Sequence, residues 1–402
     1  MRQLLSIYTQ RFLVNPAYIK SVPDPNLSLI VVIPSYKEPD ILSTLQSLAA
    51  CHPAKGRVEV IITVNAAEGS GPEIAKINQC TIDQIENWKA NQKPSFINVF
   101  TIREERLPEK FAGAGLARKI GMDEALRRWC WLDRDGPILC LDADCSVSKD
   151  YFIAAEKAFE NPELKLGHFE FCHNWENETN PLLRQGIIEY ELHLRCHILG
   201  LANAGYPFAM HTVGSCMSVR ASTYAKAGGM NRRKAGEDFY FMHKLLPLGG
   251  FEYIPATVYP SCRISDRVPF GTGRAQWERM INRKLSTTYS SEIYLILKEF
   301  FKQVPNWYAK EVSFDKLNPE VVAFLLKHQL KEKISQMKRQ SKSYDVFFRR
   351  FWQWMDGFMV LKLVHYLRDH GLPDQPVLFV AEDLIREIDN QKIKQLIQDL
   401  KM

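Results

Sequence analysis

The sequence LCLDADCS, residues 139–146, places two carboxylates directly after a short apolar run. Only Ala143 separates Asp142 from Asp144, and on a strand the side chains of residues i and i+2 point to the same face. Two carboxylates at the end of a strand can reach one hard cation, and Mg²⁺ is typically held by one or two carboxylates together with substrate phosphates. The ordinary alternative is that Asp142 caps a turn and Asp144 caps the helix expected near Lys149.

This apolar run belongs to a series of short β-branched segments that alternate with stretches of helical periodicity. The expected strands are residues 29–33, 58–64, 96–102 and 138–141, and the expected helices are residues 41–50, 73–90 and 113–129. Such alternation predicts a parallel sheet covered on both faces. Ligands of these sheets bind beyond the carboxyl ends of the strands, so the loops that follow the four strands should meet around one crevice.

The pattern changes beyond the two acids. Further strands are expected at residues 166–173, 216–220 and 251–259, and helices at residues 182–201 and 237–246. After about residue 285 the pattern is helical to residue 402. We therefore expect an N-terminal extension at residues 1–27, an α/β domain at residues 28–285 and a helical region at residues 286–402.

Composition and charge exclude several classes of protein. With 46% hydrophobic and 24% charged residues, the chain of 402 residues is globular. The net charge of +6 suits an anionic substrate or an anionic membrane surface, but no basic run interleaved with aromatics indicates nucleic acid. No stretch of 18 apolar residues predicts a transmembrane helix, and no signal peptide is evident. Nine single cysteines without a CxxC pair favour reduced thiols and a cytoplasmic location, with peripheral contact to the inner face of the membrane left open.

Three further segments accompany the two acids. Residues 31–38 read VVIPSYKE, an apolar strand that leads into a polar loop. Residues 113–121 read GAGLARKIG, a glycine-rich helix start with two cations, and residues 236–239 read GEDF at an expected helix N-terminus. Each signal is weak alone, whereas four in order at plausible spacing are specific.

Together these segments resemble the inverting glycosyltransferases of family 2, which have the GT-A fold. Residues 32–38 match the strand followed by P-[ST]-[YF]-[NK]-E, and residues 113–121 match G-x-x-x-A-R-N-x-G except that Lys119 stands for Asn. Residues 142–144 match the Asp-x-Asp metal motif, and residues 228–230 with 236–238 match the acceptor and base segment. The resemblance spans residues 28–260 and implies an α/β fold, with a Rossmann-like, mostly parallel sheet flanked by helices and a mainly helical C-terminal extension.

The resemblance implies a reaction of class EC 2.4. A sugar would pass from a nucleotide-diphosphate donor, expected to be a UDP-sugar, to a hydroxyl of a glycan, a lipid-linked or a small-molecule acceptor, as in cell envelope glycan biosynthesis. Asp142 and Asp144 would hold Mg²⁺ or Mn²⁺, Asp238 would be the general base, and Glu237 would position the acceptor. Attack opposite the leaving group would invert the anomeric centre.

The resemblance also implies a set of donor-binding residues. Glu38 would bind the ribose or base, and Asn65 or Glu68 would replace the Asp with which many members contact the base. Arg118 and Lys119 would lie near the diphosphate, the alternative being a solvated helix face. The nucleotide-sugar site would then comprise Pro34, Tyr36, Glu38, Asn65, Gly113, Arg118, Lys119 and Asp142, together with Arg267 and Arg274. The last two belong to an Arg- and Gly-rich loop that could close over the donor or merely connect two regions.

Acceptor contacts are expected from Trp175, His211 and Gly229. Trp175 could stack on a sugar or pack against its neighbours, and His211 precedes a glycine turn that should face the acceptor cleft. The aromatic and basic segment 344–367 could lie in a membrane interface or pack onto its own domain.

Two alternatives remain at this point. A degenerate GT-A domain could bind sugar or nucleotide without turnover, although all four acids of the motifs are present. A nucleotidyltransferase has a similar sheet but needs a glycine-rich basic loop after its first strand, and residues 34–39 are not such a loop.

Overall fold

The computed structural model describes the chain except residues 14, 92, 266–270, 283–285 and 402. Internal contacts divide it into two compact units. The first unit comprises Met1–Asn174 and Thr212–Ser261, and the second comprises Trp175–His211 and the described remainder of the chain from residue 262 onward. The domain boundaries expected after residues 27 and 285 stay a prediction.

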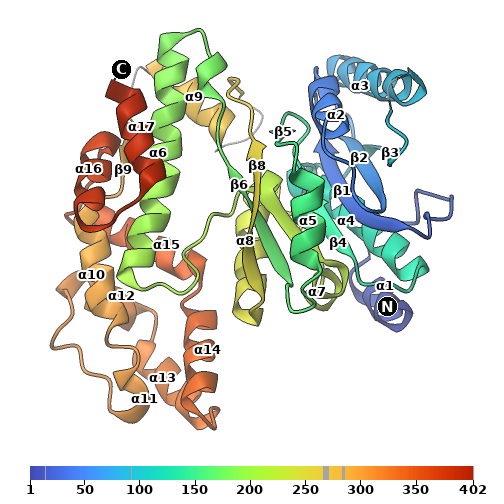
Figure 1. Cartoon of the computed structure of the whole chain (residues 1–402). Helices are drawn as coiled ribbons and strands as arrows, with labels where there is room; N and C mark the ends of the chain where they lie inside the picture. Colours follow the sequence, from blue (N-terminus) through green and yellow to red (C-terminus); the bar gives the residue numbers. More distant parts are fainter. Residues whose placement is uncertain (14, 92, 266–270, 283–285, 402) are drawn as a thin grey trace. The chain divides into compact units, whose positions relative to one another are not determined.

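The first unit contains one sheet of eight strands in the order β3-β2-β1-β4-β7-β6-β8-β5 (Figure 1). Four of its seven pairings are parallel: β2 with β3, β1 with β2, β1 with β4, and β6 with β8. The strands are β1 Leu27–Ser35, β2 Arg57–Ala67, β3 Ile97–Leu107, β4 Pro137–Cys140, β5 Ser146–Val147, β6 Leu166–Phe171, β7 Met217–Arg220 and β8 Phe251–Tyr259. The expected mostly parallel sheet is confirmed.

Helices cover this sheet because its central strands are apolar on both faces. In β1 every residue from Leu29 to Ile33 is fully buried, as expected of a strand with helices on either side. The helices of this unit are α1 Arg2–Arg11, α2 Ile41–Ala49, α3 Pro72–Asn91, α4 Ala114–Trp131, α5 Tyr151–Phe159, α7 Ala221–Lys226 and α8 Glu237–Leu245. Helix α4 contacts β1 and β2, and this brings its first turns to the carboxyl ends of these strands.

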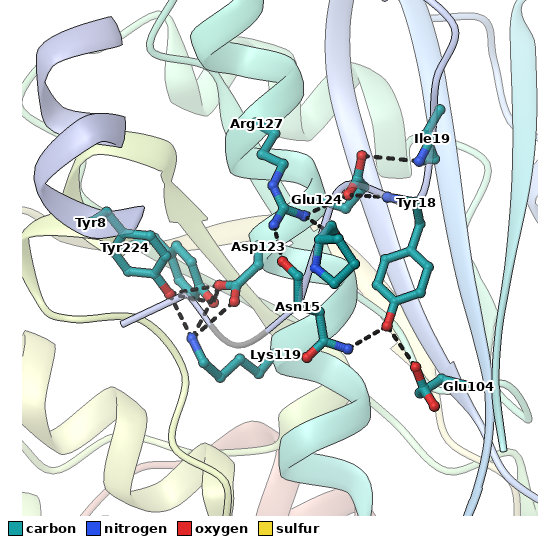
Figure 2. Close-up of polar contacts among 11 residues, drawn as sticks. Tyr8, Asn15, Tyr18, Ile19, Glu104, Lys119, Asp123, Glu124, Arg127 and Tyr224 are labelled. Carbon is teal, nitrogen blue, oxygen red and sulfur yellow. Dashed lines mark hydrogen bonds and ion pairs between the residues drawn. The ribbon is translucent and has the colours of Figure 1, made fainter. Parts of the chain in front are cut away.

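The N-terminal extension packs onto α4 and forms part of the first unit (Figure 2). The hydroxyl of Tyr8 on α1 donates to Asp123 Oδ1 at 2.6 Å and accepts from Lys119 Nζ at 2.7 Å. The Tyr224 hydroxyl donates to the same Asp123 oxygen, also at 2.6 Å. Further along, the backbone N–H of Tyr18 donates to Glu124 at 3.2 Å. The sequence analysis did not predict α1 or these contacts.

The second unit is helical, as expected. The long helix α6 contacts α9, α10, α16 and α17. The helices of the second unit are α6 Pro181–Ala204, α9 Thr272–Asn282, α10 Ser291–Phe301, α11 Asn306–Ala309, α12 Pro319–Lys327, α13 Leu330–Arg339, α14 Tyr344–Trp354, α15 Gly357–Asp369, α16 Val377–Glu387 and α17 Gln391–Lys401. A two-stranded antiparallel sheet joins β9 Thr287–Thr288 to β10 Gln375–Pro376.

The aromatic segment 344–367 forms α14 and α15 and packs onto its own unit. Phe347, Phe351 and Trp352 are buried, and so are Val360, Leu363, Val364 and Leu367 of α15. The interpretation as a helix lying in a membrane interface is therefore wrong for these side chains, because its apolar face is already covered. Among the described helices, none has the length and apolarity needed to cross a membrane.

Candidate active site

Asp142 and Asp144 lie in a turn that follows β4. The strand ends at Cys140, and the backbone N–H of Cys145 donates to the Asp142 carbonyl at 3.2 Å. The expectation that the two acids share one face of a strand is therefore wrong, because the strand has ended and the chain turns at Ala143 and Asp144. Both carboxylates are partly exposed. Since β4 pairs with β1, this turn follows the strand next to β1, whose own carboxyl end opens the expected nucleotide site.

Glu237 and Asp238 begin α8, as the sequence predicted. Gly236 precedes them in the left-handed region at φ 69°, which turns the chain into the helix. The Asn231 side chain donates to the Glu237 carbonyl at 2.8 Å and holds this loop against the helix. Asp238 Oδ1 accepts from the N–H of Phe239 at 2.7 Å, so one of its oxygens is fixed by the first turn.

Arg118 joins these acids into one cluster. Its Nη2 donates to Asp142 Oδ1 at 2.8 Å, and its Nε donates to Glu237 Oε1 at 3.3 Å. Its Nη1 donates to the Gly214 carbonyl at 3.2 Å. The side chain is only 3% exposed, so the alternative of a solvated helix face is wrong for Arg118. One guanidinium thus links the turn after β4 to the start of α8.

Gly214 belongs to the same cluster, and sequence reasoning had not assigned it a role. A Cβ on this residue would lie 2.9 Å from Arg118 Nη2 and 2.9 Å from Asp238 Oδ2. Only a residue without a side chain lets the backbone approach both groups this closely. The contact also shows that the second Asp238 oxygen faces the backbone next to Arg118. The signal in the sequence was the glycine of the turn at residues 214–216.

The charges in this cluster shift one another's protonation. Burial raises the pKa of Asp238 to about 7, and the neighbouring Glu237 carboxylate adds to the shift. Burial also raises the pKa of Glu237, although Arg118 opposes this. Burial by itself would lower the pKa of Arg118, but Asp142 and Glu237 outweigh it and raise that pKa. A carboxylate that titrates near neutral pH beside a fixed cation is suited to accept a proton.

The donor set fits a divalent metal that is shared with a substrate. Within the described residues, no three or more His, Cys, Asp or Glu side chains come together as metal ligands. Asp142 and Asp144, both partly exposed in one turn, are two carboxylates that could hold such an ion. This is the set of one or two carboxylates with which Mg²⁺ is typically held when phosphates supply further ligands.

The residues expected around the nucleotide lie at the carboxyl ends of adjacent strands. Pro34 of β1 pairs with Thr63 of β2, and Tyr36 follows β1 with 36% of its surface exposed. Glu38 is buried, and its Oε1 accepts from the Asp40 N–H at 3.0 Å. The Asn65 amide donates to the Ser35 carbonyl at 2.8 Å, which ties the ends of β1 and β2 together.

Lys119 and Gly229 lie in a different cluster from Arg118. Lys119 is buried and points to Tyr8 and Asp123, so the alternative of a solvated helix face is wrong for it as well (Figure 2). Gly229, at φ 74°, packs against the Tyr8 hydroxyl and Lys119 Nζ. Gly113 packs against the backbone of Lys234, where a Cβ would meet the carbonyl oxygen at 2.6 Å.

Trp175, His211 and Arg274 belong to the second unit. Trp175 is buried, and Lys392 Nζ lies 5.5 Å from the centroid of its ring. Of the two interpretations, packing against its neighbours therefore describes this side chain. Arg274 donates to Glu278 at 2.9 Å and lies over the Trp277 ring at 4.2 Å. His211 is partly exposed. Arg267 lies outside the described residues.

Comparisons with known proteins identify the family. The model described as glycosyl transferase family group 2 matches residues 137–365, more than half of the chain. A search of curated protein sequences found no significant match. Among solved structures, residues 1–349 of S. aureus TarS in complex with UDP-GlcNAc are similar with a TM-score of 0.42 and 14% identity, over 82% of this chain and 91% of that chain. GalNAc-T7 with UDP, GalNAc and Mn²⁺ is similar with a TM-score of 0.39 and 14% identity, over 80% of this chain and 56% of that chain.

The resemblance noted in the sequence is thereby confirmed. The matched residues include the turn with both metal-motif acids and the start of α8 with Glu237 and Asp238. The fold agrees as well, since a mostly parallel sheet is flanked by helices and followed by a helical C-terminal region. This chain belongs to glycosyl transferase family group 2 and is a glycosyltransferase.

Proposed function

We propose that this glycosyltransferase moves a sugar from a nucleotide-diphosphate donor to an acceptor hydroxyl with inversion, and that Asp238 is its general base. One observation carries the proposal. The Arg118 guanidinium donates to both Asp142 and Glu237 and lies against the glycine that borders Asp238. Asp142 and the two acids that begin α8 are thus held around one buried cation.

Asp238 would take the proton from the attacking hydroxyl. Its pKa, raised to about 7, leaves a large fraction of the carboxylate ionised at neutral pH and makes it a stronger base than an exposed Asp. The N–H of Phe239 orients one oxygen, so the side chain does not have to be ordered when substrate binds. General bases of this kind typically accelerate a reaction about 10²–10⁴-fold.

Asp142 and Asp144 would hold Mg²⁺ or Mn²⁺ against the diphosphate. Such an ion, when bound, supplies a Lewis acid that stabilises the charge of the leaving oxygens. Arg118 keeps Asp142 in place through Oδ1 and balances part of the negative charge of the cluster in the free enzyme. Glu237, buried against Arg118, would position the acceptor hydroxyl next to Asp238.

The donor and acceptor assignments are proposals of the same kind. A UDP-sugar would lie along Pro34, Tyr36, Glu38 and Asn65, with Gly113 and Arg118 as further donor residues. The acceptor would be a glycan or a lipid-linked molecule. The chemistry would serve cell envelope glycan synthesis on the cytoplasmic side of a membrane, a setting with which the net charge of +6 is compatible.

Calorimetric titration of UDP, GDP and dTDP, each with and without Mn²⁺, tests the donor and the metal. We expect one nucleotide, UDP, to bind in a Mn²⁺-dependent manner. Asp144→Ala should abolish the metal dependence, whereas the matched control Asp150→Ala, an exposed acid six residues later, should not. If the folded protein binds none of the three nucleotides, the proposed donor class is refuted.

A turnover assay of Asp238→Asn tests the base. The variant should lose transfer of the sugar yet bind the nucleotide with nearly unchanged affinity, because the proposed role of Asp238 is to deprotonate the acceptor and not to hold the nucleotide. Turnover close to that of the unmodified enzyme would remove Asp238 from its role and leave the donor proposal intact.

A further inference from the structure

The net charge of the chain is concentrated in one short segment of the second unit. Residues 327–350 contain eight of the 52 Lys and Arg residues but only two of the 46 Asp and Glu residues. The rest of the chain carries equal numbers of both signs. The segment runs from the end of α12 through α13 into α14, and we call it the basic surface.

The cations of the basic surface face solvent. In α13, Leu330, Ile334 and Met337 pack inward and so direct the polar residues of the helix outward. Phe347 and Phe351 do the same in α14. Six of the eight cations are exposed and two are partly exposed; the exposed ones are Lys327, Lys331, Arg339, Lys342, Arg349 and Arg350.

The basic surface retains its charge because acids do not neutralise it. Within the described part of the chain, no ion pair joins any of its eight cations to an Asp or Glu. The contacts that are present are neutral: Arg350 donates to the Gln340 side chain at 3.1 Å, and Lys331 Nζ lies 5.1 Å from the Phe314 ring. Elsewhere in the chain many surface cations have acidic partners, as Lys55 has in Glu160.

We propose that the basic surface docks this enzyme onto a membrane surface rich in anionic phospholipid. Two consecutive helices and their connection present the charges, and α11, α13 and α14 lie together at one end of the second unit (Figure 1). Leu326 and Tyr344, 52% and 37% exposed, border the cations and can enter the headgroup layer. Each Lys or Arg near an anionic leaflet strengthens binding about fivefold, so a cluster of this size suffices without an inserted helix.

A lipid surface fits better than a single-stranded nucleic acid. Nucleic acids are held by aromatic side chains on which bases stack between the cations. Of the described aromatic residues in the basic surface, Phe347 is buried and Phe348 is mostly covered, and only Tyr344 is exposed. The contact is therefore electrostatic and superficial, in contrast to the interfacial aromatic helix that the sequence left open as an alternative.

Co-sedimentation with vesicles tests the proposal on the chain of 402 residues. We expect binding to vesicles of phosphatidylcholine that contain about a third phosphatidylglycerol, and none to phosphatidylcholine alone. Binding should disappear between about 0.1 M and about 1 M salt, because the Debye length falls from about 10 Å to about 3 Å. Failure to bind the anionic vesicles at low salt would overturn the proposal.

A charge-neutralised variant locates the contact. Changing Lys331, Arg339, Lys342 and Arg349 to Gln should weaken vesicle binding about a hundredfold or more. All four side chains are exposed, so the variant should melt at the temperature of the unmodified enzyme and keep its nucleotide affinity. If this variant folds poorly, a double variant that changes only Lys342 and Arg349 to Gln takes its place. Lys342 lies in the connection between α13 and α14, and Arg349 lies in α14. The double variant should bind vesicles about 25-fold more weakly.

The control removes the same charge elsewhere. Changing the exposed Lys76, Lys149, Lys157 and Lys226 of the first unit to Gln should leave vesicle binding within about twofold, since these residues lie outside the basic surface. Equal losses in both variants would show that net charge alone attracts the protein. Tighter binding to heparin or to a DNA oligonucleotide than to the anionic vesicles would also refute a lipid occupant.

Discussion

Arg118→Met removes the cation around which the candidate active site is built. Methionine has a similar length and no charge, so the change tests the electrostatic role of the residue more than its packing. In the intact protein the Arg118 side chain is 3% exposed and that of Glu237 is 5% exposed. The Glu237 carboxylate would thus remain buried without its cation.

The expected decrease in the free energy of unfolding is large. Removing one partner of a buried ion pair typically destabilises a protein by about 3–5 kcal/mol, because the other charge stays buried and unpaired. Most of this cost comes from Glu237, since the side chain of Asp142 is 40% exposed and water screens its charge. Against a typical total stability of about 5–15 kcal/mol, such a loss is easily measured.

The cost should also depend on pH. Burial already raises the pKa of Glu237, and loss of Arg118, which lowers it, must raise it further. A carboxyl group whose pKa is higher in the folded than in the unfolded state binds more protons when folded, so the free energy of unfolding falls as pH rises through the folded pKa. The variant should therefore be closest to the unmodified protein at about pH 4–5 and furthest from it at about pH 8.

Urea unfolding at both pH values, followed by tryptophan fluorescence, measures the difference in the free energy of unfolding between the variant and the unmodified protein. The matched control is Arg103→Met, which breaks an ion pair with Glu105 on a half-exposed side chain and should cost less than about 1 kcal/mol. If Arg118→Met costs less than about 1 kcal/mol at pH 8, or if its cost does not grow with pH, Arg118 is not the counter-ion of this cluster.

Three shorter predictions concern the same unit. The value of kcat/KM should rise with pH and level off above about pH 7, because only ionised Asp238 accepts a proton; a pH-independent kcat/KM from pH 5 to 8 would contradict this assignment. Gly214→Ala should lower kcat about 10–100-fold with little change in nucleotide affinity, because the added Cβ would displace Arg118 and Asp238. An unchanged kcat would show that the site tolerates this displacement. Tyr8→Phe should lower the free energy of unfolding by about 1–3 kcal/mol, since it leaves buried Asp123 and Lys119 short of a partner; Tyr344→Phe, on an exposed ring, is the control and should change stability by less than about 0.5 kcal/mol.

Much of the fold follows from local patterns in the sequence. The apolar β-branched run of β1 and the 3.6-residue periodicity of α2 and α3 need no knowledge of distant residues, and their positions agree with the expectation to within a few residues. The Asp-x-Asp turn and the Gly-Glu-Asp helix start are equally local, because their spacing is carried by a few consecutive residues. The α/β class and the glycosyltransferase family were therefore predictable from the sequence.

Contacts between distant segments were not predictable in this way. Arg118 meets Asp142 and Glu237, which are 24 and 119 positions away, and no local pattern pairs them. Tyr8 reaches Asp123 across 115 positions, so the N-terminal helix had no signal that tied it to α4. From the sequence, the aromatic segment 344–367 could either lie in a membrane interface or pack onto its own domain, and only its partners within the second unit decide between the two.

Arg118 and Lys119 show most directly which features the sequence predicts and which features depend on the tertiary structure. The sequence placed both at the start of one helix and assigned them the same role. Successive residues of an α-helix point about 100° apart, so Arg118 enters the acid cluster and Lys119 enters the cluster around Tyr8 and Asp123. The sequence by itself determined the class of fold, the family and the helix that carries both cations, because these depend on short-range order. Only the tertiary structure decided which acids each cation meets, because that depends on how the helix is rotated against the sheet and on which distant segments pack around it.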